Sequence, residues 1–146
     1  MMQVKSVLVV CVGNICRSPV GERLLRAALP DTVVTSAGIN ALVGHAADKT
    51  AALVAAADGV SLDGHVSRQL TAELGASQDL ILVMESGHKH EIARRFPQLS
   101  GRTMLFDQWT GMKGIADPYQ LSQTFHEQVF QQIKAAANAW APRLKR

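Results

Sequence analysis

The sequence is poor in cysteine: its 146 residues include only two, Cys11 and Cys16. Two cysteines five positions apart cannot form the disulfide framework of a secreted domain, so we expect a reducing, cytoplasmic location. The sequence also lacks any run of about 20 apolar residues, so we expect no membrane insertion. The short apolar run near the N-terminus passes directly into Cys11 without a cleavage site of small residues, so we expect no signal peptide.

The sequence also lacks a strong charge imbalance. Fifteen Lys and Arg residues against 12 Asp and Glu residues give a net charge of +3. No basic run stands out, which argues against a nucleic-acid partner but permits an anionic substrate. Apolar residues make up 47% of the chain and charged residues 18%, which excludes a disordered or fibrous protein. A chain of this length can bury a core, and we expect one domain over residues 1–146.

Strand-like and helix-like segments alternate along the chain. Strands alternating with helices predict an α/β fold: a three-layer α/β/α domain with a central four-stranded parallel sheet. In such sheets ligands bind beyond the carboxyl ends of the strands. A long loop is expected at 107–119 because glycine and proline interrupt it. The expected strands are 7–10, 32–35, 80–84 and 103–106, and the expected helices are 18–29, 48–58, 71–74, 86–96 and one from about 122 onward.

The segment Cys11-Val-Gly-Asn-Ile-Cys-Arg-Ser-Pro19 joins the first strand to the first helix and carries the chemistry. Its amides can turn inward around an anion, assisted by the positive end of the helix dipole. Gly13 and Asn14 tolerate the left-handed backbone that such a curl requires. Arg17 can bind two phosphate oxygens at once, and the positive field favours the thiolate of Cys11. A thiolate facing phosphate predicts nucleophilic phosphoryl transfer through a phosphocysteine.

Two further sequence features bear on this reading. Ser18 and Pro19 form a helix start, with Ser18 as N-cap, and the same hydroxyl is placed to bond the thiolate. No Gly-Lys-Ser/Thr follows the loop, so it is not a nucleotide-binding loop.

A phosphatase also needs an acid for the leaving oxygen. Asp117, followed by Pro118 and Tyr119, is a candidate, although Asp-Pro is by itself a common turn.

Together, the Cys11–Pro19 and Asp117–Tyr119 motifs resemble the low-molecular-weight protein tyrosine phosphatases. The resemblance covers nearly the whole chain, and the best match is the bacterial branch that serves exopolysaccharide and capsule export. Further matching segments are Ser36–Gly38, Asp48, Gly64–Arg68 and Leu80–Met84, and, for the bacterial branch, Ala41–Gly44 and Leu105–Trp109.

This resemblance implies a role for each matching residue. The nucleophile is Cys11, the group that binds phosphate and stabilises the transition state is Arg17, and the acid and later base is Asp117. It also implies a mechanism without metal or cofactor, a monomer, and a phosphotyrosine protein as substrate, namely a bacterial membrane tyrosine autokinase. The remaining implied site residues are the phosphate-holding amides of Val12, Gly13, Asn14, Ile15, Cys16, Arg17 and Ser18, the loop supports Asn14, Ser18, Ser36 and His65, and the cleft walls Leu42, Trp109 and Tyr119.

Some alternatives stay open at this point. Cys16 is either a redox partner that forms a reversible disulfide with Cys11 or a small buried residue. An arsenate reductase of the same fold would need further cysteines or a coupled thiol, and a phosphate-binding regulatory module would not need Asp117. Animal members of the family carry an aromatic residue where Leu42 stands, so their substrate preference is not transferable. The histidines do not form a zinc set, and we expect His45 and His126 to face solvent.

Overall fold

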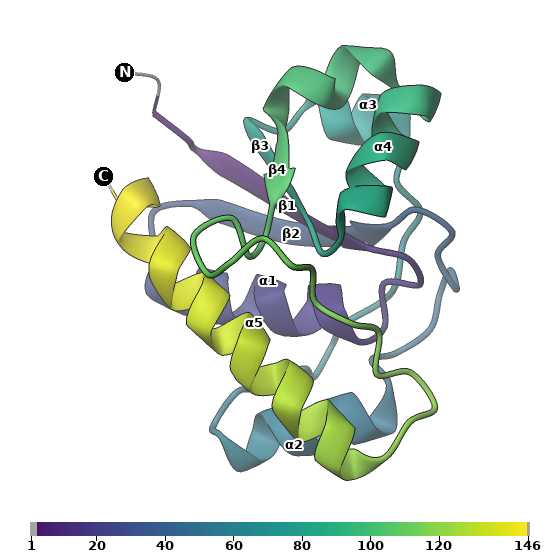
Figure 1. Cartoon of the computed structure of the whole chain (residues 1–146), viewed down its shortest axis with the longest axis vertical. Coiled ribbons are helices and arrows are strands. Elements are labelled where there is room, and N and C mark those ends of the chain that lie inside the picture. Colours follow the sequence, from purple (N-terminus) through teal and green to yellow (C-terminus); the bar gives the residue numbers. More distant parts are fainter. Residues whose placement is uncertain (1–2, 146) are drawn as a thin grey trace.

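Four parallel strands form the centre of this computed structural model, which describes residues 3–145 (Figure 1). Their order in the sheet is β2-β1-β3-β4, and each neighbouring pair is parallel. This confirms the predicted α/β fold with a four-stranded parallel sheet. The strands are β1 Ser6–Cys11, β2 Val33–Gly38, β3 Leu80–Val83 and β4 Thr103–Leu105.

Helices cover both faces of the sheet, which gives the three layers that the sequence predicts (Figure 1). The helices α1, α2 and α5 pack against one another on one face, and α3, α4 and the 3-10 helix η1 lie on the other. The sequence reading did not foresee η1. The helices are α1 Arg17–Ala28, α2 Lys49–Ala57, α3 Ala72–Ala76, α4 Ser86–Arg95, η1 Pro97–Arg102 and α5 Gln123–Leu144.

Strand β1 is paired on both edges with β2 and β3, and helices bury both of its faces. Its side chains alternate between the layers, as the period of two in a strand requires. Val7 and Val9 belong to the apolar cluster under α1, α2 and α5. Leu8 and Val10 belong to the cluster under α4 and η1. The strand is therefore fixed from both sides, and this gives the residue at its end, Cys11, a rigid position.

Helices α2 and α5 begin where the sequence predicts them, and α1 does not begin with the predicted cap. Asp48 accepts a hydrogen bond from the amide of Ala51 and caps α2, and Ser122 caps α5 in the same way. Helix α1, however, begins at Arg17, with Cys16 at the N-cap position and no side-chain cap. The prediction that Ser18 caps this helix is wrong. Its hydroxyl instead faces the thiol of Cys11.

Helix α5 buries one stripe of side chains against α1 and α2. Val129, Ile133 and Trp140 are buried as predicted. His45 is exposed, but His126 is only 3% exposed, so the expectation that His126 faces solvent is wrong. It lies one turn before Val129 on the same face of the helix, which buries it. No helix within residues 3–145 has the length and apolar character needed to cross a membrane.

Candidate active site

The loop after β1 curls around the floor of a cavity at the carboxyl end of the sheet. The cavity has a volume of about 200 Å³. It lies where ligands bind in parallel α/β sheets. Its lining combines the loop with two later segments that the fold brings to the same edge. The lining residues are Cys11, Val12, Gly13, Ile15, Cys16, Arg17, Asn40, Leu42, Asp117 and Tyr119.

The carbonyl groups of the loop are bonded by neighbouring segments outside it. Five consecutive carbonyls, from Cys11 to Ile15, each accept a hydrogen bond from another segment of the chain. A backbone whose carbonyls are occupied on the outside turns its amides to the inside, which is the arrangement that binds anions. The donors, in order, are the amides of Ile39, Asn40 and Leu42, the Nε2 atom of His65, and the amide of Asp48.

The thiol of Cys11 is buried at the bottom of this cradle. Its Sγ atom lies 2.9 Å from the Oγ atom of Ser18 and accepts a hydrogen bond from the amide of Asn14 at 3.3 Å. Helix α1 begins directly after the loop, so its positive end also faces the sulfur. Each of these contacts stabilises negative charge on sulfur more than a neutral thiol. The site is therefore built to hold a thiolate.

Asn14 connects the loop to its surroundings. It is fully buried and adopts a left-handed conformation, with φ of 61°. Its Nδ2 atom donates to the hydroxyls of Ser18 at 2.8 Å and Ser36 at 3.0 Å, and its Oδ1 accepts from the amide of Arg68 at 2.9 Å. Its own carbonyl accepts from His65 at 2.6 Å. The structure thus brings together the four residues predicted to support the loop.

A buried carboxylate lies behind Ser36. The Ser36 hydroxyl donates to Glu22 at 2.9 Å, and Glu22 is held by Arg23 at 2.8 Å and Arg26 at 3.3 Å. A buried charge of this kind is tolerated because it is paired and hydrogen-bonded. The sequence reading placed Glu22 in the first turns of the helix but gave it no part in the site. In the structure Glu22 bonds to Ser36, and Ser36 bonds to Asn14, so Glu22 belongs to the network that holds Asn14 in place.

The guanidinium of Arg17 is held from one side. The side chain is only 2% exposed, and its Nη1 atom donates to Glu85 at 2.6 Å and to the carbonyl of Ile115 at 2.7 Å. Its Nη2 atom lies 3.8 Å from the carboxylate of Asp117. Glu85 was not among the site residues predicted from the sequence. Its position, two residues after the end of β3, could have indicated it, because the carboxyl ends of parallel strands share one edge.

Asp117 enters the cavity from the loop before α5. Its Oδ1 atom accepts a hydrogen bond from the amide of Tyr119 at 3.0 Å, which fixes the carboxyl group at the start of a turn. The side chain remains 46% exposed at the mouth of the cavity. A carboxyl group above the thiol, with access to water, is positioned for proton transfer to a leaving group and from water.

The structure places two of the three predicted cleft walls at the cavity. Leu42 and Tyr119 line it and are partly exposed. Trp109, the third predicted wall, is not among the residues that line this cavity. Its ring packs edge-on against Trp140, with centroids 5.5 Å apart, and lies 4.2 Å from the guanidinium of Arg143. These contacts with α5 fix the orientation of the segment after β4, and they were not predicted from the sequence.

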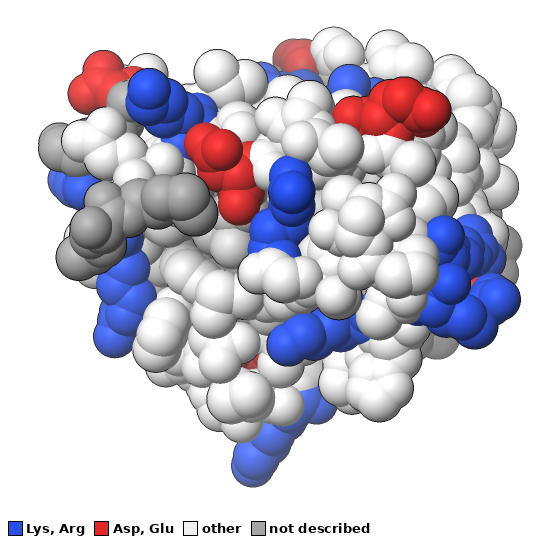
Figure 2. Space-filling view, turned by 90° about the horizontal axis from the view of Figure 1, so that it is seen from above, with Lys and Arg blue, Asp and Glu red and all other residues white. Residues whose placement is uncertain are grey.

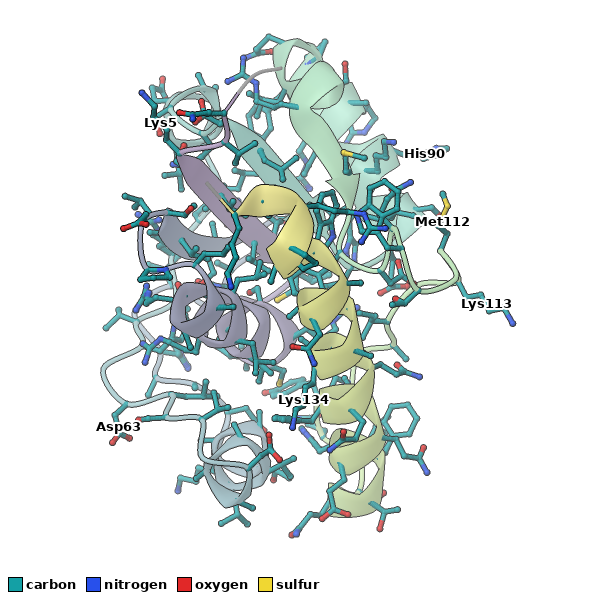
Figure 3. All side chains as sticks on the ribbon, turned by 90° about the vertical axis from the view of Figure 1, so that its left-hand side faces the viewer. Lys5, Asp63, His90, Met112, Lys113 and Lys134 are labelled. Atoms are coloured by element: carbon teal, nitrogen blue, oxygen red, sulfur yellow. The ribbon has the colours of Figure 1, made fainter. Side chains whose placement is uncertain are left out.

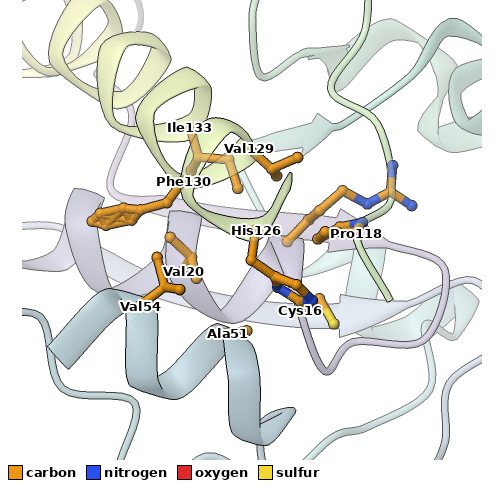
Figure 4. Close-up of a pocket in the computed structure, with 10 residues that line it drawn as sticks. Cys16, Val20, Ala51, Val54, Pro118, His126, Val129, Phe130 and Ile133 are labelled. Carbon is orange, nitrogen blue, oxygen red and sulfur yellow. The ribbon is translucent and has the colours of Figure 1, made fainter. Parts of the chain in front are cut away.

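A second, smaller cavity lies behind the loop (Figure 4). His126 projects from α5 toward Cys16 there, and its Nε2 atom lies 3.9 Å from Asp48. Burial, followed by the charges of Asp48 and Asp117, raises the pKa of the Cys16 thiol well above its usual range. Cys16 is therefore a neutral thiol at physiological pH. Both cysteines are free, and a reversible disulfide between them stays a prediction.

His88 extends the Arg17 network outward. Its Nε2 atom lies 3.5 Å from the same Glu85 oxygen that binds Arg17. Burial lowers the pKa of His88, the charge of Arg17 lowers it further, and Glu85 and Asp117 oppose this shift. The neutral imidazole is thus the favoured form at neutral pH. In that form it adds no second positive charge beside the anion site.

A buried thiol, an arginine fork and a carboxyl group around one anion cradle have the geometry for phosphate-ester chemistry. A family model described as low molecular weight phosphotyrosine protein phosphatase matches residues 6–146. The chain belongs to this family. Members of this family are protein-tyrosine-phosphatases that depend on a cysteine. The predicted enzyme class is therefore confirmed for this phosphatase.

Named relatives of the phosphatase agree with this assignment. The low molecular weight protein-tyrosine-phosphatase Etp of Escherichia coli (strain K12) is 54% identical over 145 residues, which cover 99% of this chain and 98% of Etp. The crystal structure of the tyrosine phosphatase Wzb from Escherichia coli K30, in complex with sulphate, superposes with a TM-score of 0.96 at 46% identity and covers 97% of this chain and 99% of Wzb. Wzb of Vibrio vulnificus, in complex with benzylphosphonate, gives a TM-score of 0.94 at 48% identity and covers 97% and 99% of the two chains.

Proposed function

We propose that this phosphatase hydrolyses phosphotyrosine through a phosphocysteine at Cys11. The sulfur attacks phosphorus, the bond between phosphorus and the phenolic oxygen breaks, and Asp117 gives its proton to that oxygen. A water molecule then attacks the phosphocysteine, Asp117 takes the proton, and Cys11 leaves as thiolate with inorganic phosphate as product. The observation that carries this proposal is the Cys11 sulfur on the floor of a cavity whose mouth holds Asp117.

Arg17 supplies the fixed positive charge for this reaction. Glu85 and the Ile115 carbonyl anchor its Nη1 atom, which leaves the other edge of the planar fork directed at the cavity. Because the guanidinium is buried and held before the substrate arrives, little reorganisation is needed when charge builds on the phosphoryl oxygens. The inward amides of the loop from Val12 to Ser18 contribute further donors at the same place.

Ser18 and Asn14 serve the sulfur itself. In the second step Cys11 must leave phosphorus with a full negative charge. The hydroxyl of Ser18 and the amide of Asn14 already lie within hydrogen-bonding distance of the sulfur. Hydrogen bonds to a charged group are worth about 1.5–3 kcal/mol each. They therefore lower the barrier to hydrolysis of the phosphocysteine.

The walls of the cavity suit an aromatic leaving group. Leu42 and Tyr119 present two largely apolar surfaces in the same cavity that Cys11 and Arg17 line. Vibrio vulnificus Wzb binds benzylphosphonate, which carries a phenyl ring and a phosphonate in one molecule. This similarity supports a phenyl ring between Leu42 and Tyr119 in the present phosphatase.

We infer that the physiological substrate is a tyrosine autokinase of the bacterial membrane that controls capsule or exopolysaccharide production. The sequence resemblance to that branch of the family and the similarity to Wzb and Etp support this inference. In this role the phosphatase acts as a cytoplasmic monomer on the phosphorylated kinase. The Asp117→Ala variant should bind a phosphorylated protein that wild type releases. We expect it to capture the kinase in its phosphorylated form and not in its unphosphorylated form.

The chemical proposal is tested by hydrolysis of a phosphotyrosine peptide with a metal chelator present. We expect turnover by wild type, none by Cys11→Ser, and a large loss in Asp117→Asn. A matched control is Asp63→Asn, because Asp63 is an exposed carboxylate in a loop (Figure 3) and does not line the cavity. Phosphate binding without turnover by wild type would contradict the proposal and favour a binding module. Thiol consumption that depends on arsenate would favour a reductase.

A further inference from the structure

Exposed apolar side chains continue from the cavity mouth along one side. Val43 is 64% exposed and Val66 is 63% exposed. Their segments lie side by side, because the Gly44 amide donates to the Ser67 carbonyl at 2.9 Å and the Ser67 amide to the His45 carbonyl at 2.8 Å. Val43 directly follows the wall residue Leu42. The apolar lining of the cavity therefore extends onto the outer surface over two segments.

Two arginines lie at the same end of the sheet. Arg68 donates from Nε to the carbonyl of Ser36 at 2.9 Å. Arg95 donates to the carbonyl of Ile39 at 3.0 Å and to the side chain of Asn40 at 3.3 Å. Both side chains are thus attached to the end of β2 and the residues just after it. Asn40 itself lines the cavity, so the positive charges begin at its rim.

These charges are only partly neutralised. Arg94 and Arg95 share the single carboxylate of Glu91, at 2.7 and 2.6 Å. Among the ion pairs within residues 3–145, none includes Arg68. Basic side chains gather at one edge of the molecule in Figure 2, the edge toward which the carboxyl ends of the strands point in Figure 1. The group of Arg68, Arg94, Arg95 and Glu91 holds three positive charges and one negative charge, so it carries net positive charge.

We propose that Val43, Val66, Arg68 and Arg95, here called the flank, bind the residues next to the phosphotyrosine of the substrate. The flank selects a peptide with an apolar residue beside the phosphotyrosine and an acidic residue beyond it. The inference rests on the proposed function, because it gives that function a sequence preference. A cavity of about 200 Å³ accommodates only the phosphorylated side chain, so the neighbouring residues of a protein substrate must cross its rim.

The physical basis is complementarity at the rim. The exposed surface of the two valines loses contact with water when an apolar side chain covers it, which favours binding. The acidic residues of the peptide are attracted by the arginine charge that is not neutralised. Complementary charges at the rim mainly raise the rate of association of peptide and enzyme. Small aryl phosphates reach neither group. The flank should therefore change the hydrolysis of peptides while leaving the hydrolysis of small substrates unchanged.

The test compares phosphotyrosine peptides that differ only in their flanking charge. One peptide has leucine next to the phosphotyrosine and glutamate at the following position on each side, and its partner has glutamine for glutamate. The measured quantity is the ratio of kcat/KM for the two peptides within each variant, so a general effect on the active site cancels. For wild type we expect the acidic peptide to be preferred about fivefold at low salt. The preference should vanish at about 1 M salt, where the Debye length is about 3 Å.

Val66 provides a matched pair of variants, because its exposed side chain can carry either charge. Val66→Lys should raise the preference for the acidic peptide about threefold and Val66→Glu should lower it about threefold. Both should hydrolyse a small aryl phosphate like wild type. Arg68→Gln should reduce the preference of the enzyme for the acidic peptide, and Arg95 accounts for the part that remains. A leucine-to-serine change in the peptide should lower kcat/KM for wild type more than for Val66→Ser.

Equal hydrolysis of the acidic and neutral peptides by wild type, with aryl phosphate hydrolysis intact, would overturn the flank alone. Failure to hydrolyse either peptides or aryl phosphate would overturn the proposed function and the flank with it. Binding of wild type to phosphatidylserine vesicles that Val66→Glu abolishes, with no peptide preference, would assign this surface to a lipid headgroup and contradict the peptide proposal.

Discussion

The Sγ atom of Cys11 and the Oγ atom of Ser18 lie 2.9 Å apart across the loop that joins β1 to α1. Ser18→Ala removes this contact while leaving the loop backbone in place. Loss of a hydrogen bond to a charged group costs about 1.5–3 kcal/mol, or about 10- to 150-fold in rate. We expect the loss mainly in the hydrolysis of the phosphocysteine, where Cys11 is the leaving group.

Stopped-flow measurement with a nitrophenyl phosphate distinguishes the two steps. Ser18→Ala should show a burst of nitrophenolate followed by a slow steady state. Ser18→Thr keeps the hydroxyl and serves as the control, with a smaller loss expected. A uniform decrease of both phases would show that Ser18 does not act on the leaving sulfur.

Asn14 combines a left-handed backbone with three side-chain hydrogen bonds, and two variants separate these contributions. Asn14→Gly loses the bonds but keeps the backbone freedom, whereas Asn14→Ala loses both. At about 0.5–1.5 kcal/mol per hydrogen bond, the free energy of unfolding should fall by about 2–4 kcal/mol in Asn14→Gly. Asn14→Ala should be about 1 kcal/mol less stable again. Urea denaturation measures both, and an Asn14→Ala variant as stable as Asn14→Gly would contradict the strain argument.

Asp117 should matter in proportion to the basicity of the leaving oxygen. An acid that protonates this oxygen contributes about 10²–10⁴-fold to the rate. We expect Asp117→Asn to lose this factor for unsubstituted phenyl phosphate, whose phenol has a pKa of about 10. The loss should be much smaller for dinitrophenyl phosphate, which needs no acid. A plot of log kcat/KM against leaving-group pKa checks this, and parallel lines for wild type and variant would exclude Asp117 as the acid.

The lowered pKa of His88 predicts a stability that depends on pH. Because its pKa is lower in the folded state than its ordinary value of 6.5, the unfolded state binds this proton more readily. The free energy of unfolding of wild type should therefore fall as the pH drops through about 6.5, the ordinary pKa of histidine. His88→Gln keeps a polar group beside Glu85 and removes the titration. Urea denaturation at pH 7.5 and 5.5 should show the larger decrease in wild type, and equal decreases would count against this assignment.

The parts of the site that the residues predicted without the family resemblance are those that are local in the chain. A strand, a curled loop and a helix follow one another from Ser6 to Ala28, so the placement of Cys11 and Arg17 beside each other needs no long-range information. The parallel sheet was also predictable, since alternation of strands and helices leaves few other arrangements.

Residues that act through tertiary contacts were harder to predict. Glu85 follows β3 and meets Arg17 only because β3 lies beside β1, yet the shared strand ends gave a usable signal. His126 could have been identified as buried from its place in the α5 stripe. Trp109 could not be placed from sequence, because contacts with Trp140 and Arg143 set its orientation. For Ser18 the sequence predicted both a helix cap and a contact with the thiol, and only the thiol contact is present in the structure.

The most direct test of the account is detection of the phosphoryl group on Cys11 during turnover. Acid quench of wild type within milliseconds of mixing with an aryl phosphate, followed by mass spectrometry of the peptide that contains Cys11, should reveal one added phosphoryl group. Ser18→Ala should accumulate more of it, and Cys11→Ser should neither turn over substrate nor carry the group on Cys16. Turnover with no phosphorylated Cys11 at any quench time, or turnover that survives in Cys11→Ser, would contradict the phosphocysteine mechanism.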